Sequence, residues 1–260
     1  MKRICIGFVF FYFSALQAIT EELAFEATDP IKSLAQMQFQ DDLSLVNYRS
    51  SDIANIFYVK PVIPIKAGDL LPIPQVLRFQ FQLITVPKSS TTSPTTALGD
   101  TQAFDLFIFE RTWGEWGLGP MAILPTATST ETGQGKWQIG PALGLNVMNM
   151  PRWQWGFLAQ NPISFAGNTQ RKSQNYLLFQ PFFVRHFPKG WYINSNAQWT
   201  IDWLRHAAFI PLNIGGGRVF DMGNQPVNFS TQAELTLFNN TAGVAPRFLI
   251  KFNFSILFGD

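Results

Sequence analysis

The sequence predicts an all-β protein: one antiparallel transmembrane β-barrel of about twelve strands, with ten as the alternative. Three observations favour this fold: an apolar composition, polar and apolar residues that alternate over long segments, and alternating long and short connections. Of 260 residues, 47% are hydrophobic and 15% aromatic, but only 14% are charged, against about 25% in a typical soluble domain. Such a composition suits a protein whose outer surface faces lipid.

The first residues have the order of a secretory signal peptide. Lys2 and Arg3 precede an apolar stretch over residues 4–13, and small residues follow up to Ala18. We expect residues 1–18 to be the signal peptide, cleaved after Ala18. The apolar stretch is shorter than the roughly 20 residues of a spanning helix, and no later apolar run is longer. A chain of this kind can cross a membrane only as a barrel.

The mature chain is formally neutral. Without Lys2 and Arg3 the 19 basic residues fall to 17, which equals the 17 acidic residues. A neutral chain lacks the excess positive charge with which proteins bind phosphates, so we expect no nucleic-acid partner. The one cysteine, Cys5, lies in the signal peptide, so we expect no disulfide.

The segment after the signal peptide is less regular. We expect residues 19–42 to form an N-terminal periplasmic segment or a plug, and residues 43–260 to form the barrel. Loose helical spacing predicts a short helix over Ile31–Phe39. Leu43–Tyr48 is the first predicted strand, because single-chain barrels have even strand numbers.

Eleven further strands follow, and they are clearest near the C-terminus. Period-two alternation extends over more than ten residues in Trp191–Trp203, Val227–Leu237 and Arg247–Phe258, with Leu249 and Leu257 as exceptions on the polar face. Soluble strands are about half as long. The predicted strands are residues 53–64, 74–86, 102–111, 114–124, 136–148, 152–166, 175–187, 190–203, 207–219, 225–238 and 247–258.

The connections alternate in length, as in outer-membrane barrels with short periplasmic turns and longer outer loops. The long ones are residues 87–101, 125–135, 167–174 and 239–246, and the short ones lie near residues 112–113, 150–151, 188–189 and 221–224. We therefore expect the long loops on the outside and both termini in the periplasm.

The polar faces of these strands would line the lumen. The candidates are Arg78, Gln80, Gln82, Asn194, Asn196, Gln198, Asp202, Gln232, Glu234, Lys251 and Asn253. They are equally consistent with a hydrophilic path and with a narrow barrel that its own side chains fill. On the lipid side, the expected interface anchors are Trp137, Trp153, Trp155, Trp191 and Trp203.

Catalytic chemistry has weak support. His186 and His206 are the only histidines, which excludes a multi-histidine metal site, and we expect no metal or cofactor. A barrel-embedded lipid hydrolase stays an alternative if Ser164 or Ser195 meets His186 and Asp202. Neither serine lies in a Gly-x-Ser-x-Gly motif, so we predict no catalytic residue. A closed structural or adhesion barrel is the other alternative.

Several short motifs are spread over most of the mature chain. They are Pro61-Val62-Ile63-Pro64, Leu124-Pro125-Thr126-Ala127-Thr128, Gly135-Lys136-Trp137-Gln138-Ile139-Gly140-Pro141, Ser164-Phe165-Ala166-Gly167, Gln180-Pro181-Phe182 and Gly223-Asn224-Gln225-Pro226-Val227. Together they resemble an uncharacterised family of outer-membrane β-barrels that is linked to phenol-degradation gene clusters and often mislabelled as neuromedin U-like. In one departure, Gly259-Asp260 follow Phe258, whereas many such barrels end on an aromatic residue.

The resemblance implies an outer-membrane location and passage or uptake of small organic molecules, among them aromatic or hydrophobic ones. It brings no catalytic residue. We therefore expect a monomeric outer-membrane channel or uptake protein. Its expected partners are membrane lipid and lipopolysaccharide, the barrel-assembly machinery and a small organic solute.

Overall fold

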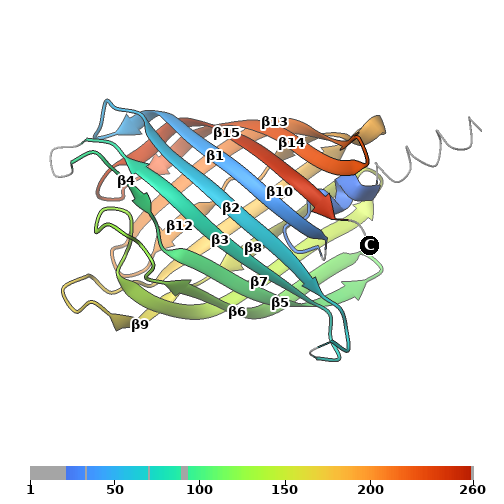
Figure 1. The fold of residues 1–260 in the computed structure, drawn as a ribbon, viewed down its shortest axis with the longest axis horizontal. Coiled ribbons are helices and arrows are strands. Elements are labelled where there is room, and N and C mark those ends of the chain that lie inside the picture. Colours follow the sequence, from blue (N-terminus) through green and yellow to red (C-terminus); the bar gives the residue numbers. More distant parts are fainter. Residues whose placement is uncertain (1–21, 33, 70, 89–92, 259–260) are drawn as a thin grey trace, which may run out of the picture.

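A computed structural model describes residues 22–32, 34–69, 71–88 and 93–258. The predicted signal peptide lies outside these residues. Antiparallel strands wind around one axis and close on themselves (Figure 1). Closure comes from the pairing of β1 with β15 and of β8 with β10.

Fifteen strand segments make up twelve barrel strands. They are β1 (Ala35–Tyr48), β2 (Ala54–Ile65), β3 (Gln75–Val86), β4 (Thr95–Leu98), β5 (Thr101–Arg111), β6 (Gly114–Leu124), β7 (Lys136–Met150), β8 (Trp153–Gln160), β9 (Ile163–Gly167), β10 (Tyr176–His186), β11 (Trp191–Ser195), β12 (Trp199–Asp202), β13 (Ala207–Met222), β14 (Gln225–Asn239) and β15 (Ala245–Phe258). Three barrel strands are interrupted: β4 with β5 both pair with β3, β8 with β9 both pair with β7, and β11 with β12 both pair with β10 and β13. The prediction of twelve strands is confirmed, and the alternative of ten is wrong.

The N-terminal part of the barrel differs from the expectation. β1 begins at Ala35, ahead of the expected start at Leu43, and its first residues pair with β15 from Ala35 opposite Phe258 onward. The helix predicted over Ile31–Phe39 is therefore wrong over residues 35–39. Helical turns occur earlier, over residues 22–27. The apolar spacing that suggested a helix is outweighed by the two ladders of backbone hydrogen bonds that residues 36–39 form with β2 and β15.

The two ends of the barrel differ. The described termini lie at the same end (Figure 1), where the strands are connected by short turns, by the 3-10 helix η1 (Pro188–Gly190) and by the longer β2–β3 connection. The four long segments predicted as outer loops all lie at the opposite end. We call these the terminal end and the loop end.

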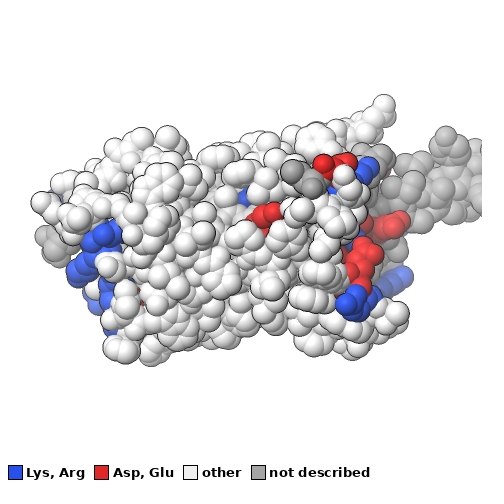
Figure 2. Space-filling model, turned by 90° about the horizontal axis from the view of Figure 1, so that it is seen from below, with Lys and Arg blue, Asp and Glu red and all other residues white. Residues whose placement is uncertain are grey.

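Each long strand separates polar from apolar side chains, as β14 illustrates. Asn228, Ser230, Gln232, Glu234 and Thr236 are buried in the interior, whereas alternate residues such as Phe229, Leu235 and Leu237 are exposed on the outside. Figure 2 shows the same division over a whole face: charged side chains gather towards the two ends, and the middle is almost free of them. Within the described residues, no helix is long and apolar enough to span a bilayer.

Candidate functional site: the lumen and its N-terminal plug

The loop end is narrowed by the connection between β6 and β7. Asp100 holds it, because its Oδ2 accepts a hydrogen bond from the Gln134 backbone N–H at 2.6 Å and its Oδ1 accepts one from the Ala127 N–H at 3.2 Å. Thr132 donates its hydroxyl to the Leu98 carbonyl at 2.7 Å. Residues 131–134 thereby become part of the wall of a cavity in the lumen.

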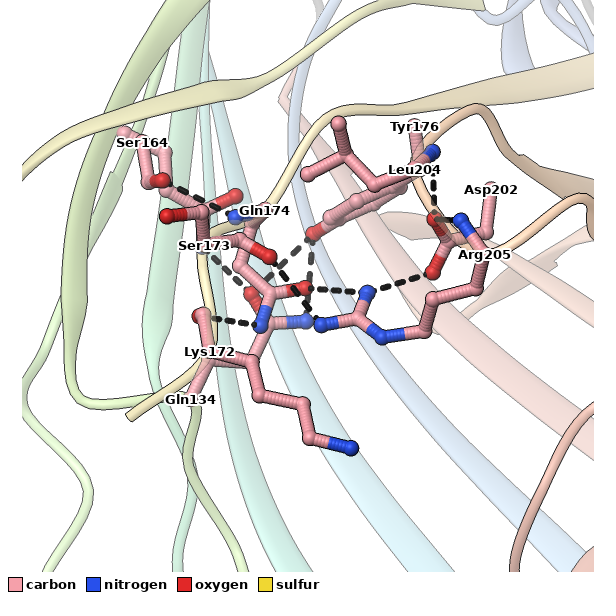
Figure 3. A network of polar contacts seen from close by, with 10 residues as sticks. Gln134, Ser164, Lys172, Ser173, Gln174, Tyr176, Asp202, Leu204 and Arg205 are labelled. Carbon is pink, nitrogen blue, oxygen red and sulfur yellow. Dashed lines mark hydrogen bonds and ion pairs between the residues drawn. The ribbon is translucent and has the colours of Figure 1, made fainter. Parts of the chain in front are cut away.

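Arg205 ties neighbouring loops together at this end. Its guanidinium forms an ion pair of 2.5 Å with Asp202 and donates to the Ser173 carbonyl at 3.0 Å. Gln174 in turn receives a hydrogen bond from Arg205 and donates its N–H to the Ser164 hydroxyl at 2.9 Å. Figure 3 shows Arg205 reaching from the β12–β13 turn to the β9–β10 loop. The loop end is thus a cross-linked rim.

Two cavities of about 430 and 360 Å³ lie beneath this rim. They share the lining residues Tyr58, Gln80, Ile84, Gln198 and Thr200, and we call them together the outer vestibule. One wall of the smaller cavity is apolar, with Ile84, Val86, Phe209, Val244, Pro246 and Leu249, while its floor is charged. An entering molecule therefore meets an apolar wall above a polar floor.

An ion pair and hydrogen bonds of amide side chains cross the floor of the vestibule. Lys251 forms an ion pair of 2.7 Å with Glu234. Lys60 donates to the Gln40 side-chain oxygen at 2.8 Å. Asn213 donates to Gln232 at 3.2 Å. These contacts involve side chains from β1, β2, β13, β14 and β15, so polar side chains from five strands narrow the middle of the lumen.

A smaller cavity of about 110 Å³ lies beyond the floor. We call it the polar chamber, and it shares Gln40 and Lys251 with the vestibule. Its lining consists of Ala27, Thr28, Asp29, Pro30, Gln38, Gln40, Arg78, Phe182, Tyr192, Asn194, Asn196, Asn228, Ser230, Gln232, Lys251 and Asn253. Residues 27–30 form its base, so the N-terminal segment stands across the lumen.

This segment, residues 22–32 with Leu34, is called the plug below. Phe25 stacks on the ring of His186, with 3.8 Å between ring centroids. Gln154 of β8 donates to the Phe25 carbonyl at 3.0 Å and accepts from the Thr28 hydroxyl at 2.9 Å. The plug is thereby held against β8 and β10 near the terminal end.

Asp29 is the most enclosed polar group of the plug, with 2% of its surface exposed. Its carboxylate accepts hydrogen bonds from the Ile31 N–H at 2.9 Å and from the Asn146 amide, and its backbone carbonyl accepts one from Arg78 at 3.2 Å. Burial and the neighbouring Glu115 carboxyl raise the pKa of Asp29 well above its ordinary value. Asp29 lines both the polar chamber and a further cavity on the terminal side.

Apolar contacts complete the seal. Ile31 is fully buried and packs with Val76, Leu106 and Leu158. Opposite it, the barrel has a glycine, Gly144, where an added Cβ would lie 2.3 Å from Ile31 Cγ2. The lumen wall is therefore shaped to accept this plug residue.

The residues predicted to line the lumen lie, with one exception, in the walls of these cavities. Ten of the eleven line the vestibule or the chamber: Arg78, Gln80, Gln82, Asn194, Asn196, Gln198, Gln232, Glu234, Lys251 and Asn253. Asp202 instead binds Arg205 at the rim and caps the β12–β13 turn. Further lining residues, which were not predicted from the sequence, lie on β1 and β2: Gln38, Gln40, Asp42, Tyr58 and Lys60. The alternation of Gln36, Gln38, Gln40 and Asp42 would have revealed β1.

The five tryptophans lie on the outer face near both ends. Trp137 and Trp203 are near the loop end and are half exposed. Trp155 and Trp191 are exposed and lie near the terminal end, where Trp153 is half buried beneath the Arg185 guanidinium. This placement is compatible with two interface belts.

The residues considered for a hydrolase do not meet. His186 pairs with Tyr192 at one end of β10, and Asp202 pairs with Tyr176 at the other, about 33 Å away at 3.3 Å per residue. Ser164 binds Gln174 at the loop end, and Ser195 lies on the outward face opposite Phe183. Among the described residues, no three His, Cys, Asp or Glu side chains cluster closely enough to hold a metal ion.

Comparison with known proteins gives structural matches only. No protein-family model matches the sequence, and no curated protein matches it. An outer membrane channel from Pseudomonas putida F1 has a TM-score of 0.61 at 12% identity, over 88% of this chain and 97% of that chain. The NanC porin has a TM-score of 0.54 at 10% identity, over 86% and 100%. Outer membrane phospholipase A from Escherichia coli has a TM-score of 0.44 at 12% identity, over 90% and 99%. The first two matches show that the chain has the closed β-barrel fold of outer-membrane channels.

Proposed function

We propose that the protein is a channel or uptake protein of the outer membrane for small organic molecules, closed at its terminal end by the plug. The observation that carries this proposal is the succession of the outer vestibule and the polar chamber, which follow one another through the lumen and end on residues 27–30. A barrel with only a structural role has no need of a vestibule with an apolar wall and a charged floor.

The geometry also supports a movable closure. The plug forms no strand of the barrel and contacts the wall mainly through side chains, so its departure would break side-chain contacts but no ladder of backbone hydrogen bonds. A segment without such a ladder opens at a lower free-energy cost than the strands around it. We therefore assign opening to the plug and not to the barrel wall.

The solute class rests on the vestibule and on the family resemblance. The apolar wall with Ile84, Phe209 and Leu249 suits a hydrophobic or aromatic part of a solute, and the floor with Lys60 and Glu234 suits its polar part. Contacts with lipopolysaccharide, folding by the barrel-assembly machinery and a monomeric state remain predictions.

The test is conductance in planar bilayers, with three forms of the mature protein. One is intact, one lacks residues 19–34, and one carries a flexible Gly/Ser segment of equal length in place of residues 22–34. The deletion stops before Ala35 because β1 begins there. We expect steady conductance in both altered forms and only brief openings in the intact protein.

The conductance of the two altered forms distinguishes a channel closed by its plug from a barrel that is always closed. If the Gly/Ser form conducts like the deletion, the packing of the plug closes the lumen, because a loose chain of the same length does not. If neither altered form conducts, the channel proposal is wrong and a closed structural or adhesion barrel takes its place.

A further inference from the structure

The polar chamber has the composition of a site for a small polar molecule. Two cationic side chains, Arg78 and Lys251, project into it. Around them stand amides and hydroxyls from four strands and the β11–β12 connection, namely Gln38, Gln40, Asn194, Asn196, Asn228, Ser230, Gln232 and Asn253. Convergent polar groups of this kind fix the orientation of bound ligands.

Two polar atoms of the lining are buried and form no hydrogen bond with another described residue: Arg78 Nε and Asn194 Oδ1. The first is a charged donor and the second is an acceptor. Leaving such buried atoms without a hydrogen-bond partner costs free energy, so they define what a ligand would supply. The ligand must bring a strong acceptor for Arg78 and a donor, such as a hydroxyl, for Asn194.

The charge of the chamber favours an anion. Glu234 neutralises Lys251 in an ion pair of 2.7 Å. Arg78 forms no ion pair among the described residues, and its recorded hydrogen bond is to the neutral Asp29 carbonyl. The Asp29 carboxyl is turned towards Asn146 and the Ile31 N–H. Arg78 thus lacks an ion-pair partner there, and its charge is offset only in part by the nearby Asp29 carboxyl, whose pKa is raised by burial and by Glu115.

We propose that the polar chamber binds a small hydroxylated carboxylate, whose carboxylate meets Arg78 and whose hydroxyl donates to Asn194. At roughly 30 Å³ for each water in the liquid, the cavity of about 110 Å³ holds three to four waters or one hydroxy acid of about that volume. The chamber opens to the vestibule at Gln40 and Lys251. The inference adds a small polar acid to the solutes proposed for the channel and so rests on that function.

Binding is measured with the intact mature protein in a neutral detergent, by ligand-observed saturation-transfer NMR, which detects weak binding without any transport. The probe is glycerate. Glycerol has the same size and hydroxyls without the charge, and propionate has the charge without the hydroxyls. We expect saturable binding of glycerate, weaker binding of propionate and none of glycerol.

Two isosteric variants place a negative charge in the chamber without touching Arg78: Asn194→Asp and Asn253→Asp. Since like charges in an enclosed site repel strongly, each should weaken glycerate binding about tenfold or more. Asn168→Asp makes the same change in the exposed β9–β10 loop, where Asn168 binds the Gln170 N–H, and should leave binding within about twofold. Arg78→Gln should abolish it.

The outcomes separate this inference from the channel proposal. Glycerol binding as well as glycerate, or unchanged binding in both chamber variants, overturns the inference and leaves the conductance result unaffected. Glycerate binding that both variants weaken, in a protein that never conducts even without its plug, upholds the site and rejects the channel.

Discussion

At the scale of single residues, the most consequential contact joins two acids. Asp29 of the plug and Glu115 of β6 are both 2% exposed, and after burial itself the neighbouring Glu115 carboxyl is the main cause that raises the pKa of Asp29. Such a pair is stable when it holds one proton between the two groups and repels itself when both are ionised. Arg78 faces Asp29 from β3 and partly offsets the repulsion. The contact between plug and wall therefore depends on a proton.

The sign of this dependence follows from the raised pKa of Asp29. Below the ordinary pKa of 3.8, Asp29 is protonated whether the plug is docked or not. Docking of the plug is therefore most favourable in this pH range. As the pH rises through the raised pKa, ionisation favours the undocked state, so docking weakens. We expect the open fraction of the intact protein to increase several-fold between about pH 4 and pH 8, measured by single-channel recording.

Asp29→Asn removes this titration while keeping the shape. Asn146 has an unpaired side-chain oxygen that can accept from the new amide after a rotation, so the plug should still dock. The pH dependence should flatten in this variant and persist in Asp69→Asn, which lies in the exposed β2–β3 turn. A pH dependence that survives in Asp29→Asn would contradict this account.

At the scale of elements, the sequence predicts strands well where polar and apolar residues alternate strictly along the strand. β14 alternates throughout and β15 alternates except at Leu249 and Leu257, and their predicted bounds are close to the observed ones. The predicted range of β1 was too short for two reasons. Asp41 interrupts the apolar outer face of the strand, and the apolar residues before it have a spacing that resembles a helix. The plug was foreseen only as a possibility, since its position depends on contacts such as Thr28 with Gln154, which are distant in sequence.

The fit between the plug and β7 yields a prediction at the same scale. Gly144→Ala would place a methyl group 2.3 Å from Ile31 Cγ2, and overpacking of this kind costs about 1–3 kcal/mol. The clash should displace the plug, because the strands of the barrel are held by backbone hydrogen bonds. We therefore expect the open fraction of the channel to rise about fivefold or more. The control is Gly216→Ala on the outward face of β13, where the nearest atom outside its strand is the Tyr192 carbonyl at 3.0 Å.

Conductance traces of both alanine variants check this. An unchanged open fraction in Gly144→Ala would mean that Ile31 adjusts in place. A loss of folded barrel in the same variant, seen as lost heat-modifiable migration on gels, would mean that the strand yields first.

At the scale of the whole molecule, the barrel presents an apolar belt to the membrane, and Asp105 is an exception to it. Its neighbours along β5, Leu106 and Ile108, point inward and are buried, which places Asp105 on the outer face near the middle of the strand. Its Oδ1 atom forms no hydrogen bond with any described residue. A carboxylate at such a position weakens a barrel in lipid, although less than a basic residue would.

Asp105→Asn should therefore stabilise the protein in the membrane by about 1 kcal/mol. The measurement is urea unfolding in lipid vesicles, with Asp52→Asn in the exposed β1–β2 loop as the matched control, which should change little. The gain should disappear in detergent solution, because water reaches the side chain there and solvates the charge. A destabilised Asp105→Asn variant in lipid would instead mean that the carboxylate is bound within the assembled membrane, and the belt around β5 would then be a contact surface for another protein and not for lipid.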